Sequence, residues 1–116
     1  MLTIYGIPNC DTIKKTRRWL EANGVEYAFH DYKKAGCPPA LARRFLQALG
    51  SEQLINTRGT TWRNLPESVR NTVSPATAAN LMSEHPSLIR RPIIDADGVW
   101  LAGFNEAELR GVLHRN

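Results

Sequence analysis

The amino-terminal third of the chain alternates between hydrophobic patterns typical of strands and of a helix. Residues 2–6, LTIYG, form a short run of strand-forming residues that ends at a glycine. Residues 11–23 repeat apolar positions at helical spacing, and Gly24 follows as a helix stop. Residues 25–32, VEYAFHDY, alternate again, as a strand with one apolar face does. A strand, a helix and a strand joined by short loops predict a parallel pair with a right-handed crossover.

The middle of the chain predicts helices and loops only. Residues 39–49 place apolar side chains at steps of four and end before Gly50. Residues 65–71, LPESVRN, predict a further short helix, and residues 33–39, KKAGCPP, predict a loop. Residues 74–85 begin with a serine suited to the N-cap and a proline at the first helical position.

The carboxy-terminal part predicts a hairpin followed by a helix. Residues 92–95 and 99–103 flank the sequence Ala-Asp-Gly, which is a strong hairpin turn signal. Asn105, with Glu108 three residues later, resembles a capping box that opens a last helix. The whole order predicts an α/β fold: a thioredoxin-like four-stranded mixed sheet, with helices on both faces and an inserted helical region.

Length and composition fit one globular domain. The chain has 116 residues, of which 42% are hydrophobic and 22% charged, enough to bury a core without disulfide or metal support. We expect a single domain over residues 1–116, with a thioredoxin-like core at about 1–35 and 87–116 and a helical insert at about 36–86. No apolar run is long enough for a membrane span, and residues 1–6 lack the basic segment and long apolar stretch of a secretory signal, so we expect none. Two cysteines make no disulfide framework, so we expect the protein in the reducing cytoplasm. We also expect a monomer.

The charge balance is basic, with a formal net charge of +4 and a pI near 9.4. The Lys and Arg residues are scattered and form no basic arm, so a nucleic-acid partner is not expected. A small anionic substrate, the carboxylates of a peptide and a merely solvated basic surface remain open alternatives. His30, His85 and His114 lie far apart and lack metal-ligand spacing, so no metal site is expected.

Cys10 stands in the loop GIPNC, between the first predicted strand and the first predicted helix. The unpaired N–H groups at a helix start favour the thiolate, the form in which a cysteine is nucleophilic. Lys14, one turn on, adds positive charge, whereas the carboxylate of Asp11 opposes the thiolate. A cysteine that only packs is the alternative, but a polar, turn-rich loop favours exposure and a reactive role.

No second cysteine lies near Cys10. Dithiol enzymes have one three positions after the first, and here that position is Ile13. An adduct on Cys10 must therefore be resolved by a thiol from solution, by another protein or by Cys37. We interpret Cys37 as an incidental loop thiol rather than the resolving one. Its distance from Cys10 in the fold decides between the two, since a bridge needs Cα atoms within about 7 Å.

Three segments together resemble the ArsC family, which includes glutaredoxin-linked arsenate reductases and Spx-type regulators: TIYGIPNCDTIKKTRRWLEANGVEYAFHDY, INTRGTTWRNL and LIRRPIID. The resemblance covers Leu2 to Leu113 and is strongest to the YffB-like members, which share C-D-T-x-K-K. It implies a glutathione-dependent thiol reductase with no bound cofactor. Glutathione is the implied co-substrate, glutathione or glutaredoxin the implied partner, and a small anionic compound or a disulfide the implied substrate.

The resemblance also implies roles by position. Cys10 matches the nucleophile, Arg91 an arginine beside it, Arg58 a second arginine of the anion site, and Pro92 a proline that follows a cis peptide bond. Guanidinium groups near the thiol would favour the thiolate and hold a carboxylate or oxyanion by paired hydrogen bonds. The expected catalytic residue is thus Cys10, and the expected substrate- and anion-binding residues are Arg91, Arg58, Lys14, Asn9 and Pro92.

Two positions depart from the branches of this family. Phe104 stands where arsenate reductases carry a third arginine, and Ile13 removes the CxxC of the redox-switch regulators. The sequence therefore favours a monothiol oxidoreductase. The alternatives are a non-catalytic Spx-like regulator that docks on RNA polymerase and a true arsenate reductase.

Overall fold

The computed structural model describes residues 1–114, so the last two residues of the predicted domain lie outside the described part. The chain forms two compact units, one made of Met1–Ala35 with the segment from Arg91 onward, the other of Gly36–Arg90. The first unit contains β1 (Leu2–Gly6), α1 (Asp11–Ala22), β2 (Tyr27–Asp31), α2 (Tyr32–Ala35), β3 (Ile93–Ala96), β4 (Val99–Ala102) and α8 (Glu106–Leu113). The second contains α3 (Pro39–Leu49), α4 (Ser51–Leu54), α5 (Thr60–Arg63), α6 (Glu67–Arg70), α7 (Pro75–Glu84) and the 3₁₀ turn η1 (Pro86–Leu88).

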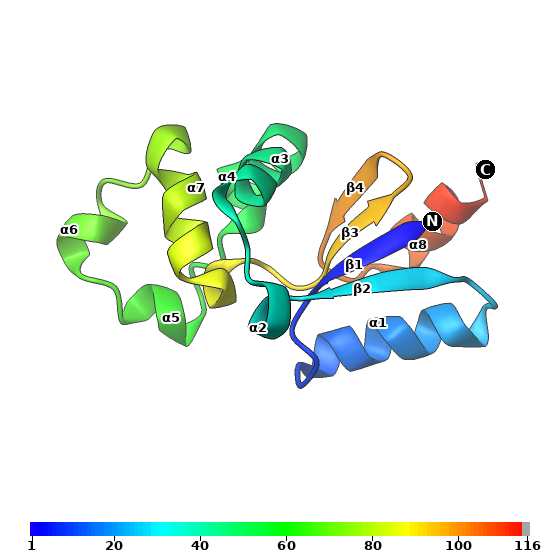
Figure 1. Cartoon of the computed structure of the whole chain (residues 1–116). Coiled ribbons are helices and arrows are strands. Elements are labelled where there is room, and N and C mark those ends of the chain that lie inside the picture. Colours follow the sequence, from blue (N-terminus) through cyan, green and yellow to red (C-terminus); the bar gives the residue numbers. More distant parts are fainter. Residues whose placement is uncertain (115–116) are drawn as a thin grey trace. The chain divides into compact units, whose positions relative to one another are not determined.

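The first unit is built on a four-stranded sheet in the order β2-β1-β3-β4 (Figure 1). β1 pairs with β2 in parallel, while β1 with β3 and β3 with β4 are antiparallel. This sheet confirms the predicted thioredoxin-like α/β fold with its parallel pair and its hairpin. At the hairpin turn, Asp97 and Gly98 both have positive φ, which is why the Asp-Gly pair was a usable signal.

One face of this sheet is covered by both α1 and α8. Ile13 and Leu20 of α1 and Leu109 of α8 are completely buried in the same cluster as Ile4 and Ile94 of the sheet. Burying each such side chain contributes about 1.5–3 kcal/mol. The apolar stripes of both helices are buried against the same row of strand residues. Helices on both faces of the sheet stay a prediction.

The opposite face of the sheet carries aromatic side chains. Residues alternate between the two faces of a strand, so Tyr5 points away from its neighbour Ile4. The Tyr5 ring lies 5.2 Å from the His30 ring and 6.1 Å from the Trp100 ring, measured between centroids.

The second unit consists of helices, as predicted for the insert. Phe45 of α3 and Met82 of α7 are fully buried within it. α7 begins as expected at Ser74: the Thr77 backbone N–H donates to the Ser74 hydroxyl, and the Thr77 hydroxyl accepts from the Ser74 N–H at 2.9 Å. α6 confirms the short helix predicted within residues 65–71.

Three single-turn helices, α2, α4 and α5, were not predicted. Each of these helices has only four residues. A helix this short does not repeat an apolar position, so hydrophobic periodicity cannot predict it. The predicted loop at residues 33–39 is therefore wrong for Lys33–Ala35, which belong to α2. In the described part of the chain, no helix is long and apolar enough to cross a membrane.

Candidate active site

Four strand ends meet at one edge of the sheet in the first unit. The register pairs Gly6 with Asp31, Tyr5 with Ile93, and Ile93 with Ala102. β1, β2 and β4 therefore end at this edge and β3 begins there. The loop that carries Cys10 leaves β1 at this edge, and in Figure 1 it lies beside α2.

Cys10 occupies the N-cap of α1. Its backbone is extended, with φ −102° and ψ 131°, and its carbonyl accepts the first helical hydrogen bond from the Lys14 N–H at 3.0 Å. The thiol makes no capping hydrogen bond, so it leaves the N–H groups of the first helical turn without a side-chain cap. The side chain is half-buried and packs against the core cluster of the unit. Cys10 thus lies at the positive end of a twelve-residue helix, with part of the residue open to solvent.

Arg91 and Pro92 come immediately before β3 at the same sheet edge. The Arg91–Pro92 peptide bond is cis, as the resemblance implied. Pro92 is buried and its carbonyl accepts from the Gly103 N–H at 2.8 Å, which ties the start of β3 to the residue that follows β4. Arg91 is half-buried. Tyr5 near the end of β1 pairs with Ile93 at the start of β3. Arg91 and Pro92, which precede Ile93, therefore lie at the same end of the sheet as the Cys10 loop, which follows β1.

Asn9 is exposed and has a partner that the sequence did not reveal. The Lys33 Nζ donates to the Asn9 Oδ1 at 3.3 Å, and the Lys33 backbone N–H donates to the Asp31 Oδ1 at 2.8 Å. This brings a second cation, besides the exposed Lys14, to the residues around Cys10. The predicted parallel pairing of β1 and β2 could have indicated this contact. Residues that follow two parallel neighbouring strands lie at the same end of the sheet, and Asn9 follows β1 while Lys33 follows β2.

Phe104 also lies at this end of the unit. It is half-buried and packs against the same core cluster as Cys10. The Lys15 Nζ lies 5.6 Å from the centre of its ring, and the Trp19 ring meets it edge-on at 6.3 Å. The Phe104 ring has no donors for an oxyanion, and its match to the third arginine of arsenate reductases stays a prediction from the resemblance.

Arg58 and Cys37 belong to the second unit. Arg58 is exposed, and its backbone N–H donates to the Asn56 Oδ1 at 3.1 Å. Cys37 lies outside the helices, as expected of a loop residue, yet only 3% of it is exposed. Burial raises the pKa of the Cys37 thiol from 9.0 to about 11, so this thiol stays protonated at neutral pH. Within residues 1–114, no group of three or more His, Cys, Asp and Glu side chains is placed to hold a metal ion.

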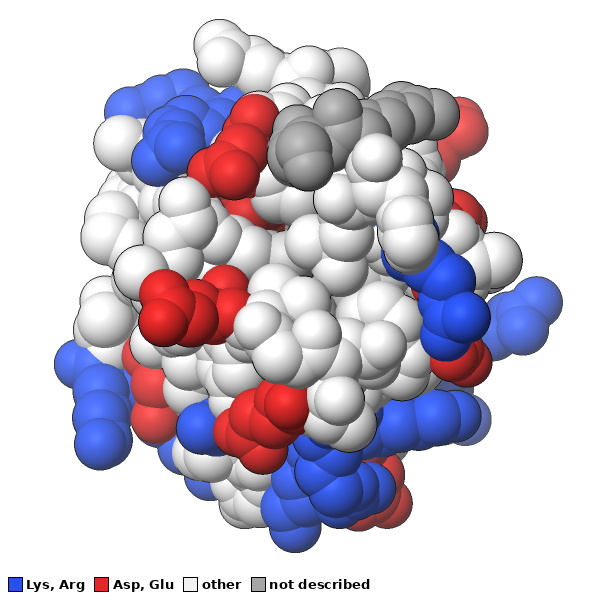
Figure 2. All heavy atoms as spheres, turned by 90° about the vertical axis from the view of Figure 1, so that its right-hand side faces the viewer, with Lys and Arg blue, Asp and Glu red and all other residues white. Residues whose placement is uncertain are grey.

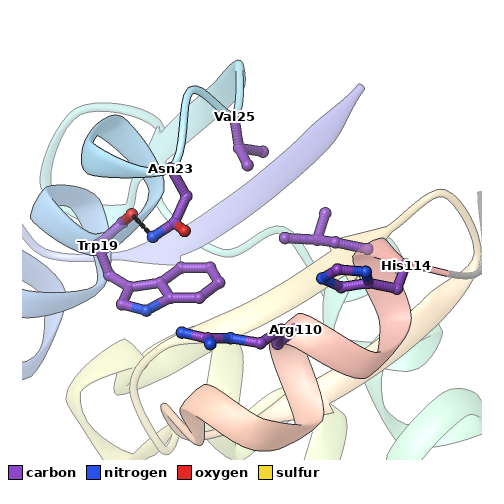
Figure 3. A pocket seen from close by; sticks show the side chains of 6 residues that line it. Trp19, Asn23, Val25, Arg110 and His114 are labelled. Atoms are coloured by element: carbon purple, nitrogen blue, oxygen red, sulfur yellow. Dashed lines mark hydrogen bonds between the residues drawn. The ribbon is translucent and has the colours of Figure 1, made fainter.

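A separate hollow of about 220 Å³ lies toward the carboxyl ends of α1 and α8 (Figure 3). The Arg110 guanidinium lies beneath the Trp19 indole, 5.7 Å from its centre, and both groups donate to the Glu106 Oε1. The hollow is lined by Trp19, Asn23, Val25, Arg110, Leu113 and His114. None of the predicted site residues is among them.

The sheet order, the cis bond before Pro92 and a cysteine at the start of the first helix define a protein of the thioredoxin-like class. The model of the ArsC family matches residues 5–112, and the chain belongs to that family.

Three relatives show the breadth of this family. The chain is 34% identical to the global transcriptional regulator Spx of Streptococcus agalactiae over 121 residues, covering all of this chain and 85% of Spx. The solved structure of the YffB protein superposes with a TM-score of 0.93 at 38% identity, covering 97% of this chain and 99% of YffB. The solution structure of an arsenate reductase (ArsC) related protein from Brucella melitensis has a TM-score of 0.77 at 49% identity, over 95% of this chain and 92% of that protein.

Proposed function

We propose that this chain is a cytoplasmic thiol–disulfide oxidoreductase that uses Cys10 as its single nucleophile and glutathione as its co-substrate. One observation carries the proposal: Cys10 is partly exposed at the N-cap of α1, while the other thiol, Cys37, is buried and held protonated. Ile13, the position of a second cysteine in dithiol enzymes, is a fully buried core residue. An adduct on Cys10 therefore depends on a thiol from outside the chain.

The reaction is a series of thiol–disulfide exchanges. The Cys10 thiolate attacks one sulfur of a substrate disulfide, the S–S bond breaks, and the departing thiolate leaves with the electron pair and takes a proton from water. A first glutathione thiolate then attacks the Cys10 sulfur and releases the rest of the substrate as a second thiol, so that Cys10 carries glutathione. A second glutathione thiolate attacks the bound glutathione sulfur, releases Cys10 as a thiolate and forms oxidised glutathione. The substrate gains two electrons, and two glutathione thiols supply them.

The cationic and polar groups at the sheet edge suit an anionic co-substrate. Arg91 and Lys14 would bind a carboxylate of glutathione, and Asn9 would donate to the same ligand from its amide. Pro92 would position the backbone before β3 beside the bound ligand. Arg58 enters this proposal through the family resemblance, as a second arginine for the anion. These groups attract anions chiefly through charge-assisted hydrogen bonds.

Mass spectrometry of the protein treated with oxidised glutathione tests the proposal. We expect one glutathione adduct, located on Cys10, that free glutathione removes. The Cys10→Ser variant should gain none. A wild-type protein that stays unmodified and also resists alkylation at neutral pH, or that carries the adduct on Cys37, contradicts the proposal.

Similarity to Spx over the whole chain favours a second candidate, a regulator that docks on RNA polymerase without turnover. Under this alternative Cys10 is dispensable. A pull-down that recovers polymerase, together with a Cys10→Ser variant that keeps full function in cells, would select the regulator over the reductase.

A further inference from the structure

The helix that begins at Cys10 carries a row of cations that the proposed reaction does not fully use. Cys10, Lys14 and Arg18 follow one another at steps of four, so their side chains lie one turn apart along one face of α1. Lys14 and Arg18 are both exposed. We call the pair Lys14 and Arg18 the α1 row.

The charges of the α1 row are not neutralised within the described residues. Neither side chain forms an ion pair with another residue of 1–114. α1 as a whole carries four basic and two acidic residues. In Figure 2 several basic side chains lie along the lower edge of the face shown, with acidic side chains beside them, at the level at which α1 lies in Figure 1.

The neighbours of the α1 row leave it open to a ligand. Arg17 turns away toward β2, where its Nε donates to the Tyr27 hydroxyl at 3.0 Å and its guanidinium lies 4.6 Å from the Phe29 ring. Lys15 lies over Phe104. The two carboxylates on α1 flank the row: Asp11 stands at its start, and Glu21, which accepts from Tyr27, stands beyond its end.

The spacing of the row matches that of an extended peptide. Four residues of α-helix rise about 6.0 Å, and alternate residues of an extended chain, which point to the same side, lie about 6.6–6.8 Å apart. A peptide whose cysteine sulfur is at Cys10 therefore places its second and fourth residues from the cysteine opposite Lys14 and Arg18. The first and third residues point away from the helix.

We propose that the α1 row recognises an acidic, extended protein segment with carboxylates at the second and fourth positions from the substrate cysteine. The inference rests on the proposed function, since it names the substrate that Cys10 attacks. The selectivity for the acidic segment would come from two exposed ion pairs, one with Lys14 and one with Arg18. Each pair is weak on its own and is screened by salt.

Two nonapeptides with the same composition test the spacing. Each has a central cysteine, four glutamates and four glycines. The in-phase peptide has glutamates at the second and fourth positions on both sides, and the out-of-phase peptide has them at the first and third. Each cysteine is supplied as a mixed disulfide with thionitrobenzoate. Attack by Cys10 forms a bond to the peptide sulfur, breaks the S–S bond and releases thionitrobenzoate with the electron pair, which is followed by absorbance.

Rates are divided by those of the same peptides with 2-mercaptoethanol, which removes intrinsic differences in reactivity. At low salt we expect the in-phase peptide to react about three- to tenfold faster than the out-of-phase peptide, as two exposed ion pairs allow. About 0.5 M salt should abolish the difference. Arg18→Glu should also abolish it, whereas Arg43→Glu, the same charge change on an exposed residue of α3, should leave it unchanged.

A neutral hydroxyethyl disulfide of thionitrobenzoate separates this inference from the proposed function. Suppose that Cys10 reacts with the neutral disulfide, but the two peptides react equally or Arg18→Glu still prefers the in-phase peptide. Then the α1 row does not recognise the substrate, and this inference is wrong while the proposed function stands. If Cys10 reacts with no disulfide, the proposed function fails and the inference falls with it. Equal peptide rates accompanied by duplex DNA binding that Arg18→Glu removes would assign the row to nucleic acid and overturn the inference.

Discussion

Gly6 is the residue at which β1 ends and the Cys10 loop begins, and the structure predicts that even a methyl group there is costly. A Cβ built on Gly6 would overlap the Ile13 Cδ1 and lie 3.0 Å from the Ile13 Cγ1. Ile13 is fully buried in the core cluster, so its side chain has little room to move away. The close approach of β1 to α1 at this point sets the path of the loop that carries Cys10.

The size of the effect follows from overpacking. Gly6→Ala forces an extra methyl group into a filled core, which costs about 1–3 kcal/mol. Ile13→Val removes the methyl group that blocks it and alone costs about 0.5–1.5 kcal/mol. In the double variant the new Cβ occupies the space that Cδ1 leaves. The double variant should therefore be destabilised by at least about 1 kcal/mol less than the sum of the single variants.

Urea unfolding of the four proteins of this cycle measures the coupling. Gly111→Ala is the matched control, because a Cβ there meets nothing within 4 Å and the residue lies inside α8, so this change should be neutral or stabilising. Additive losses in the cycle, or a Gly6→Ala protein as stable as wild type, would refute the reasoning that Ile13 and Gly6 are packed in direct contact.

Three further predictions concern the buried thiol, the anion site and the helical unit. The folded pKa of Cys37, about 11, exceeds its ordinary 9.0, so the stability it contributes is complete below about pH 9 and is lost as pH rises toward 11. Urea unfolding should show wild type losing up to about 2–3 kcal/mol more than Cys37→Ala over that range; parallel pH profiles would contradict this. Phe104→Arg should raise glutathione- and glutaredoxin-coupled arsenate reduction at least about tenfold, because one charge-assisted hydrogen bond contributes about 1.5–3 kcal/mol; no gain over a Phe104→Leu control would remove Phe104 from the anion site. Ser74→Ala should lower the unfolding free energy by about 1 kcal/mol through loss of the α7 cap, and an unchanged urea midpoint would show that the cap contributes nothing.

The sequence predicted the elements whose signals are local, such as helical periodicity, turn residues and N-caps. α1 shows its buried positions Ile13, Thr16 and Leu20 at helical spacing, and the Asp-Gly turn marks the hairpin. The Asn105 side chain accepts from the Glu108 N–H at 2.9 Å, which confirms the predicted N-cap. These signals lie within one element and need no knowledge of its neighbours.

Contacts between distant segments were the harder part. The bond between Lys33 and Asn9 depends on two strands ending at the same edge of the sheet. The burial of Cys37, in a segment that looks like a polar loop, depends on how the surrounding chain packs. The shared face of α1 and α8 follows from tertiary packing, whereas periodicity reveals only that each helix has an apolar side. The assignment of Arg91, Arg58 and Pro92 to a working site still rests on the family resemblance, and that of Lys14 and Asn9 on their place in the chain beside Cys10. All five stay predictions.

The pH dependence of Cys10 alkylation by iodoacetamide, followed by mass spectrometry in wild type and Arg91→Ala, tests the nucleophile most directly. Arg90→Ala, a change at the neighbouring exposed arginine, is the control. At pH 7 Cys10 should react faster than N-acetylcysteine, Arg91→Ala should slow it, and Arg90→Ala should leave it unchanged. A Cys10 that reacts no faster than N-acetylcysteine, at a rate that Arg91→Ala does not alter, would contradict an activated thiol at the start of α1.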